Sequence, residues 1–231
     1  MKKLYILVLF NIGILNIYSQ NFSIGVYSGY GTYDLSNVKQ MQQQALNYYS
    51  PLEIKSVEKF PDYINYSFTL EYKTIRNYSW GLNLAYFSTA ARNHLLDYSG
   101  EYKLDMHVDA YRFGVLFKKS YPLNKDLSLY YNIKSGLVYS NFKIDEKITI
   151  NNVDTVDYNN INKSNAFFIE PTIGASYYLG RNFSIDTNVG YQADINSRFI
   201  TKKDSYIYWS GLRFLVGVNY NLSSVLGKVI K

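Results

Sequence analysis

The chain has 231 residues, a formal net charge of +6, no cysteine and an aromatic content of 18%, and 26 of its residues are tyrosine. Without cysteine there are no disulfides, no thiolate metal sites and no lipid-modified cysteine behind a leader. The basic residues form no stripe, so the charge does not indicate a nucleic-acid-binding protein.

The first residues have the pattern of a secretory leader. Lys2 and Lys3 precede an apolar run at 4–14, and the small Ser19 marks a cleavage point. An uncleaved membrane anchor is the alternative, but the run is too short for one and Asn11 interrupts it. We expect cleavage after residue 19, which leaves 22 basic and 18 acidic residues and a net charge of +4.

Eight segments then alternate with a period of two, the pattern of strands whose two faces meet different surroundings. In the clearest of them, every second residue from Ile64 to Tyr72 is large and apolar, and the residues between are Asn, Ser, Thr and Glu. The predicted strands are 22–33, 61–74, 78–88, 104–120, 127–140, 166–179, 183–195 and 206–222.

The connections between these segments alternate in length. Short turns of turn-forming composition are predicted at 75–77, 124–126 and 180–182. Long connections are predicted at 34–60, 89–103, 141–165 and 196–205. Long external loops and short periplasmic turns are typical of up-and-down outer-membrane barrels, and an even strand number puts both termini on the periplasmic side.

Volume decides which face points inward. Eight strands with about five large apolar residues each would place roughly forty bulky groups in an interior that has little room at this strand number. A soluble barrel with an apolar interior, such as a lipocalin, is therefore disfavoured. The sequence predicts an all-β fold, an eight-stranded antiparallel up-and-down transmembrane β-barrel whose apolar face meets lipid.

Several stretches carry a family resemblance. The first loop ends Glu-Lys-Phe-Pro-Asp-Tyr at 58–63, and Ser-Thr-Ala at 88–90 is followed by Asp-Tyr-Ser-Gly-Glu-Tyr at 97–102. With the eight strands, these stretches resemble the outer-membrane β-barrel domain proteins of Bacteroidetes-type bacteria. The resemblance implies a small porin-like barrel in the outer membrane, and it does not imply one function, because such barrels serve many.

The last strand also carries a predicted insertion signal. Gly217, Tyr220 and Leu222 have the Gly-x-x-aromatic-x-apolar spacing, which resembles the signal by which barrel-assembly machinery recognises a terminal strand. Leu215 stands where that signal has a polar residue. We expect residues 1–19 to be the leader, 20–222 the barrel and 223–231 a short periplasmic tail.

Charged side chains on the inward face form a predicted lumen network. Charges in a narrow interior must be paired or wetted. In one interpretation, such pairs gate a small conduction path, with Glu71 and a basic partner as the movable pair. In the other, they fill the lumen as a plug, which we favour because eight strands leave little aqueous space. The network consists of Glu71, Lys73, Arg112, Lys118, Lys134, Glu170, Asp186 and Arg213.

Aromatic residues on the outward face are predicted to form girdles at the membrane interfaces, where Tyr and Trp settle. They are Tyr72, Tyr78, Trp80, Tyr131, Tyr177, Tyr208 and Tyr220.

One histidine raises the alternatives of an enzyme or a metal site. His107 shares a strand face with Asp105 and Asp109, and Ser88 and Ser99 lie in the same region, as a lipid hydrolase or acyltransferase would need. No spacing motif fixes these residues together, and three alternating residues on one strand are too far apart to chelate one ion. We therefore expect solvated rim residues and no catalytic, cofactor or metal site.

Two of the long loops leave alternatives. In the first, Leu35, Val38, Met41, Ala45 and Tyr49 recur at helical spacing, and Asp34 is placed to cap a helix. That helix would dock a partner or lie over the barrel mouth; otherwise the loop is weakly ordered, with Gln40 to Gln44 solvated. The Asn- and Asp-rich stretch 151–162 would form turns or bind a divalent cation weakly.

Together these features favour a non-enzymatic outer-membrane barrel with an envelope-structural role or a surface-binding role through its external loops. A narrow channel or a component of a secretion or transport assembly is the first alternative, and a lipid-modifying enzyme is the second. The expected partners are outer-membrane lipids, the barrel-assembly machinery and an external ligand or protein, with no nucleic acid and no cofactor.

Overall fold

The computed structural model describes residues 22–33, 35–48, 63–96, 98, 100–150, 153–195 and 207–222. The predicted leader at 1–19, the tail at 223–231 and the fourth long connection at 196–205 lie outside these residues.

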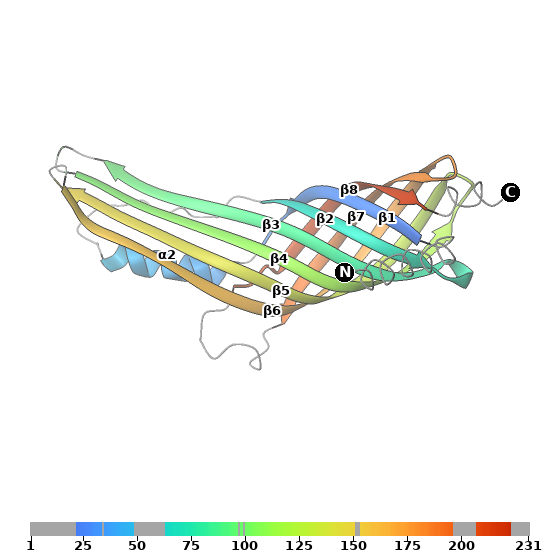
Figure 1. Ribbon diagram of the computed structural model, residues 1–231, viewed down its shortest axis with the longest axis horizontal. Helices are drawn as coiled ribbons and strands as arrows, with labels where there is room; N and C mark the ends of the chain where they lie inside the picture. Colours follow the sequence, from blue (N-terminus) through green and yellow to red (C-terminus); the bar gives the residue numbers. More distant parts are fainter. Residues whose placement is uncertain are drawn as a thin grey trace, which may run out of the picture.

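Eight antiparallel strands close into a barrel (Figure 1). Each strand pairs with its neighbours along the chain, and β1 pairs with β8 to complete the ring. This confirms the predicted eight-stranded up-and-down barrel. The strands are β1 (Phe22–Gly31), β2 (Tyr63–Lys73), β3 (Tyr78–Leu96), β4 (Gly100–Pro122), β5 (Leu127–Ile150), β6 (Val153–Leu179), β7 (Phe183–Ile195) and β8 (Gly211–Asn221).

The three short turns form where the sequence predicts them. Between β2 and β3, the 3-10 turn η2 (Ile75–Asn77) holds Arg76 and Asn77 at φ values of 67° and 63°, and the Thr74 amide donates to the Tyr78 carbonyl at 2.7 Å. Between β4 and β5, the Asn124 side-chain oxygen accepts from the backbone amide of residue 127 at 2.7 Å. Between β6 and β7, Gly180 takes a φ of 80°, which glycine adopts without strain.

Four strands are much longer than predicted. Strands β3 to β6 have 19, 23, 24 and 27 residues, and they run far past the other four (Figure 1). The prediction of long loops at 89–103 and 141–165 was therefore wrong for most of both ranges, which form the upper parts of two hairpins. We call this four-stranded extension, residues 88–96, 100–110, 140–150 and 153–166, the platform.

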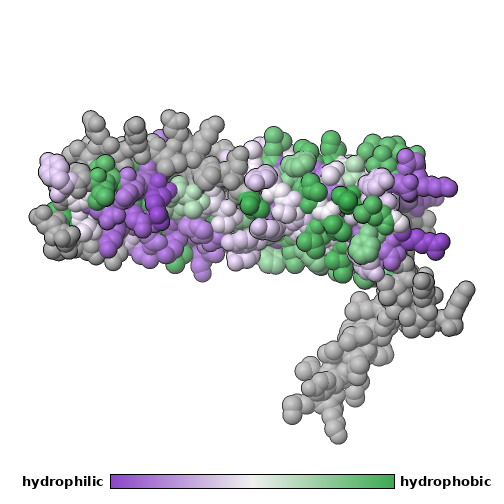
Figure 2. All heavy atoms as spheres, turned by 90° about the horizontal axis from the view of Figure 1, so that it is seen from above, coloured by the Kyte–Doolittle hydropathy of each residue, from purple (hydrophilic) through white to green (hydrophobic). Residues whose placement is uncertain are grey.

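The strands continue into the platform because the alternation continues with its polarity reversed. In β4, the outward residues change from Tyr111, Phe113 and Val115 in the barrel wall to Asp109 and His107 in the platform. The inward residues change in the opposite sense, from Arg112 and Lys118 to Val108, Met106 and Leu104. On the face seen in Figure 2, hydrophobic residues gather over the right-hand half of the molecule, and hydrophilic residues gather over part of the left-hand half and at the extreme right.

The helix α2 (Ser36–Tyr48) packs against the inward face of the platform. Leu35, Val38 and Leu46 join one apolar cluster with platform residues such as Leu104 and Phe142. This confirms the predicted helix. The alternative of a solvated glutamine run is wrong for one member: Gln42 is fully buried, and its side-chain amide donates to the Asn93 side-chain oxygen at 2.6 Å.

Candidate functional site

The predicted lumen charges all lie on inward positions of the barrel wall. Seven of the eight are almost fully buried, and Lys73 is half-buried. The structure divides them into an upper group near the platform and a lower group toward the short turns.

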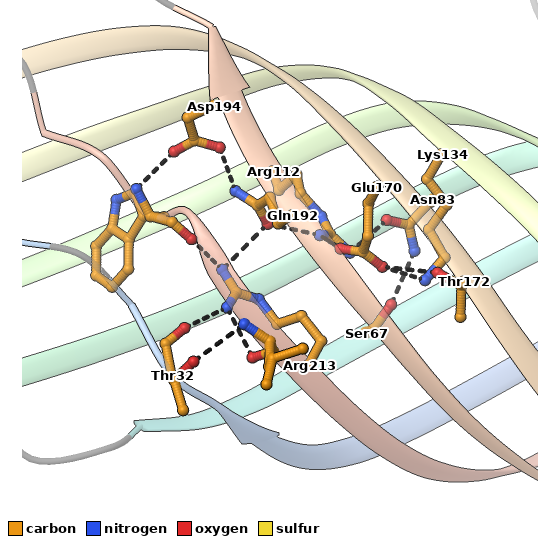
Figure 3. A network of polar contacts seen from close by, with 12 residues as sticks. Thr32, Ser67, Asn83, Arg112, Lys134, Glu170, Thr172, Gln192, Asp194 and Arg213 are labelled. Carbon is orange, nitrogen blue, oxygen red and sulfur yellow. Dashed lines mark hydrogen bonds and ion pairs between the residues drawn. The ribbon is translucent and has the colours of Figure 1, made fainter.

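The upper group centres on Glu170 (Figure 3). One of its oxygens accepts from Arg112 and the other from the Lys134 ammonium at 2.6 Å, and none of the three side chains is more than 4% exposed. Arg112 also donates to the side-chain oxygens of Gln192 and Asn83, each at 2.9 Å. Two cations thus share one carboxylate, and the remaining guanidinium bonds go to neutral amides.

A roof lies above this group. Arg213 donates to the Thr32 carbonyl at 2.5 Å, to the Trp209 carbonyl and, at 3.3 Å, to the Gln192 side-chain oxygen. The fully buried Trp209 indole donates to the Ser140 hydroxyl at 2.9 Å. Its ring packs edge-on against Phe87, with centroids 4.7 Å apart. The barrel mouth is therefore closed by packed side chains as well as by ion pairs.

The lower group centres on Lys118. Its ammonium lies 3.4 Å from Glu71, 3.9 Å from Asp186 and 4.2 Å from the centre of the Tyr130 ring. Asp186 also accepts from the Tyr27 hydroxyl at 3.1 Å. The predicted partnership of Glu71 with a basic residue is therefore present, with Lys118 as the base.

Space inside the lumen is scarce. The cavity beside Lys118 holds about 10 Å³, which is close to the least that one water molecule needs. Several buried side-chain polar atoms of the lower lumen have no hydrogen-bond partner within the protein, among them Thr69 Oγ1, Asn132 Oδ1 and Asn188 Oδ1. Within the part of the chain that the structure describes, side chains fill this section of the lumen and leave room for isolated waters.

The outward aromatic residues form two sets. Of the predicted girdle residues, Tyr72, Tyr78, Trp80, Tyr131, Tyr177 and Tyr220 lie toward the short turns, and Tyr208 lies at the opposite end, half-buried. The second set was not predicted: Tyr66, Tyr86, Tyr111 and Tyr139 pair across β2 to β5 in one continuous row. In β3 to β5, the tyrosine of this row is the last apolar residue before the outward face turns polar, and that position would have revealed the row.

The outward face of the platform carries salt bridges. Asp105 accepts from Arg92 at 2.5 and 2.9 Å and lies 3.2 Å from the Lys103 ammonium. Partial burial would raise the pKa of Asp105, but hydrogen bonds from these two bases outweigh it and hold the pKa below its ordinary value. Lys143 pairs with Asp145 at 2.7 Å in the neighbouring strand.

The enzyme and metal alternatives gain no support from the platform. His107 contacts Asp109 at 3.0 Å, and Ser88 is paired across the strands with Asp109, but no hydrogen bond joins His107 to a serine in the described part of the chain. Ser99 lies outside it. Among the described residues, no three His, Asp or Glu side chains are grouped closely enough to hold a metal ion.

The residues of the predicted insertion signal lie at the seam between β1 and β8. Gly217 is paired with Tyr27, and a Cβ atom at Gly217 would lie 2.3 Å from the Tyr27 ring, so this position needs glycine. Tyr220 packs on Phe183, with ring centroids 4.7 Å apart, and the Leu222 amide donates to the Phe22 carbonyl at 2.9 Å.

Comparison with known proteins gives structural likeness only. No protein-family model matches the chain, and no curated protein does. The attachment invasion locus protein Ail of Yersinia pestis, solved with the heparin analogue sucrose octasulfate, is 15% identical, with 87% of this chain and 96% of that chain covered and a TM-score of 0.38. Neisserial surface protein A is 10% identical, with the same coverage and a TM-score of 0.45. The N-terminal β-barrel domain of Pseudomonas aeruginosa OprF is 14% identical, with 86% and 96% covered and a TM-score of 0.39. Likeness at this level says nothing about function.

Proposed function

We propose that this protein is a non-enzymatic barrel of the outer membrane that holds the platform outside the cell as a binding surface. The reversal of polarity along β3 to β6 carries the proposal. A wall that is apolar outside and polar inside suits lipid, and a platform that is polar outside and apolar inside suits water.

The height of the apolar wall fits a membrane. From Leu129 near the short turns to Tyr139 in the tyrosine row, β5 advances about ten residues, or about 33 Å at about 3.3 Å per residue. At the tilt of about 40° usual for such strands, this spans about 25 Å, the usual height of the apolar band in outer-membrane barrels. Among the described residues, no helix has the length and apolar composition that a membrane crossing requires.

The platform is suited to binding because it is stiff. Four paired strands and α2 enclose an apolar cluster, so the outward salt-bridged face is held in one shape and loses little conformational entropy when a ligand docks. The ligand is an external molecule or protein. Delivery by the leader and insertion by barrel-assembly machinery belong to the same proposal.

A narrow channel is the second candidate, favoured by the buried polar atoms without protein partners in the lower lumen. Conduction would require the ion pairs of both groups to open, that of Glu170 above and that of Glu71 with Lys118 below. Bilayer recordings test this: discrete conductance steps that disappear in Glu71→Ala would support the channel, and a silent wild-type protein would support the plug.

The main test uses single cysteines, because the chain has none of its own. Tyr98→Cys lies at the fully exposed end of the platform, Lys125→Cys in a short turn, and Val115→Cys on the apolar wall. On intact cells, a membrane-impermeant maleimide is expected to label only position 98. Position 115 is expected to react only with a lipid-soluble maleimide.

Other outcomes would overturn the proposal. Label at 125 without label at 98 would mean that the orientation is inverted. Strong labelling of position 115 by the impermeant reagent would mean that the wall is not in a membrane. Heat-modifiable gel mobility of each variant in purified outer-membrane fractions controls for folding.

A further inference from the structure

One charged side chain breaks the apolar wall. Between the tyrosine row and the short turns, Lys119 is the one charged residue on the outward face of the described strands. It lies between Tyr78 on β3 and Tyr131 on β5, directly paired with both. Placing a cation against lipid costs free energy, so we expect Lys119 to have a function at this position in the girdle.

The Lys119 ammonium is held in place by its neighbours. It lies 3.7 Å from the centre of the Tyr78 ring and 5.8 Å from that of Tyr121, and it donates to the Arg76 carbonyl at 2.5 Å. The left-handed φ of 67° at Arg76, uncommon for a residue with a side chain, belongs to the turn that presents this carbonyl. One hydrogen bond leaves donors of the ammonium for an anion, and a positioned ammonium binds phosphate as a point charge.

An apolar groove begins beside this ammonium. Its volume is about 550 Å³, within the range of about 300–1,000 Å³ for clefts that bind small molecules. The small side chain of Ala175 forms part of its floor, between Leu129 and Thr187 on the neighbouring strands. The walls are Tyr121, Tyr131, Ile173, Val189 and Phe214. Tyr121 and Tyr131 thus border both the groove and Lys119.

We propose that Lys119 and the groove beside it bind one phospholipid of the periplasmic leaflet, with an anionic headgroup preferred. Lys119 receives the phosphate, and the groove takes an acyl chain. Charge favours a lipid over a second copy of the chain, because the outward wall of the described strands offers no carboxylate to meet Lys119. The proposal rests on the proposed function only in that the wall faces lipid and the short turns face the periplasm.

Native mass spectrometry of the folded full chain in detergent tests the site, with phosphatidylglycerol and phosphatidylcholine of matched acyl chains. One lysine near a membrane surface is worth about a fivefold preference for an anionic lipid, so the wild type is expected to bind the first phosphatidylglycerol about fivefold more tightly. Lys119→Gln is expected to equalise the two lipids. Lys125→Gln makes the same charge change in a turn and is expected to keep the preference. Ala175→Phe fills the groove and is expected to weaken both lipids.

Four results would overturn the site. These are equal binding of both lipids by the wild type, an equal loss of preference in Lys125→Gln, displacement of the lipid by inorganic phosphate at the same concentration, and a dimer that disappears in Ala175→Phe. The last would mean that the groove is an interface between copies. Heat-modifiable mobility, measured on every variant, separates loss of the site from loss of the barrel.

Discussion

Neutralising Glu170 should expose how much the lumen depends on one carboxylate. Glu170→Gln keeps the shape of the side chain but leaves Arg112 and Lys134 as two buried cations without the carboxylate that both of them contact. Removing one partner of a buried ion pair costs about 3–5 kcal/mol. We therefore expect the unfolding equilibrium constant to rise by about 150- to 5,000-fold.

The measurement is urea unfolding of the barrel in lipid vesicles, followed by heat-modifiable gel mobility. Glu101→Gln is the matched control, because Glu101 pairs with His94 at a site where both side chains are more than 40% exposed, and such pairs are worth at most about 1 kcal/mol. Adding Lys134→Met to Glu170→Gln should recover much of the loss, since the remaining Arg112 keeps its bonds to Gln192 and Asn83. If Glu170→Gln costs no more than the control, the lumen is wet enough to solvate its charges and is not a plug.

Three further outcomes are expected. Val38→Asp buries a charge between α2 and the platform, so trypsin should cut at Lys39 faster while the barrel keeps its heat-modifiable gel shift. The exposed Gln43→Asp should change neither the cutting rate nor the gel shift. Equal cutting in both variants would contradict the packing of α2 on the platform. Trp209→Ala removes the largest fully buried side chain and should lower the free energy of unfolding in urea by about 3–5 kcal/mol. A loss below about 1 kcal/mol would mean that Trp209 does not help to close the barrel mouth. In carboxyl NMR, the pKa of Asp105 should lie below the ordinary aspartate value of about 3.9. Its ion pairs therefore stabilise the platform above that pH, and the stabilisation is lost as the pH falls through the lowered pKa. A midpoint above about 3.9 would refute this.

The strands of the wall could be predicted because their outward positions follow a simple rule. Every outward residue from Ile64 to Tyr72 is apolar, so the period of two is visible in the sequence. The platform was predicted as loops because the outward positions of the same strands turn polar there, as at Asp109 and His107. Leu104, Met106 and Val108 alternate as regularly as the wall does, but they point inward, whereas the apolar residues of the wall point outward.

The pairing of the lumen charges could not be predicted. Inward positions follow from alternation, so all the charges could be placed in the lumen. The choice of Glu170 as the partner of both Arg112 and Lys134 depends on how β4, β5 and β6 are staggered, and no local pattern encodes that register. The burial of Trp209 was hidden for a similar reason, since its partners Ser140 and Phe87 come from two other strands.

The pairing of β1 with β8 has a consequence for how the protein assembles. The β2–β3 hairpin closes a loop of a few residues, whereas the seam joins Ser23 to Asn221. Loop-closure entropy rises by about 0.6 kcal/mol per doubling of length, so this one pairing costs about 3 kcal/mol more than a hairpin of about five residues. Local hairpins can therefore form early and in any order, and we expect the meeting of the two chain ends to be the slow, committing step of folding.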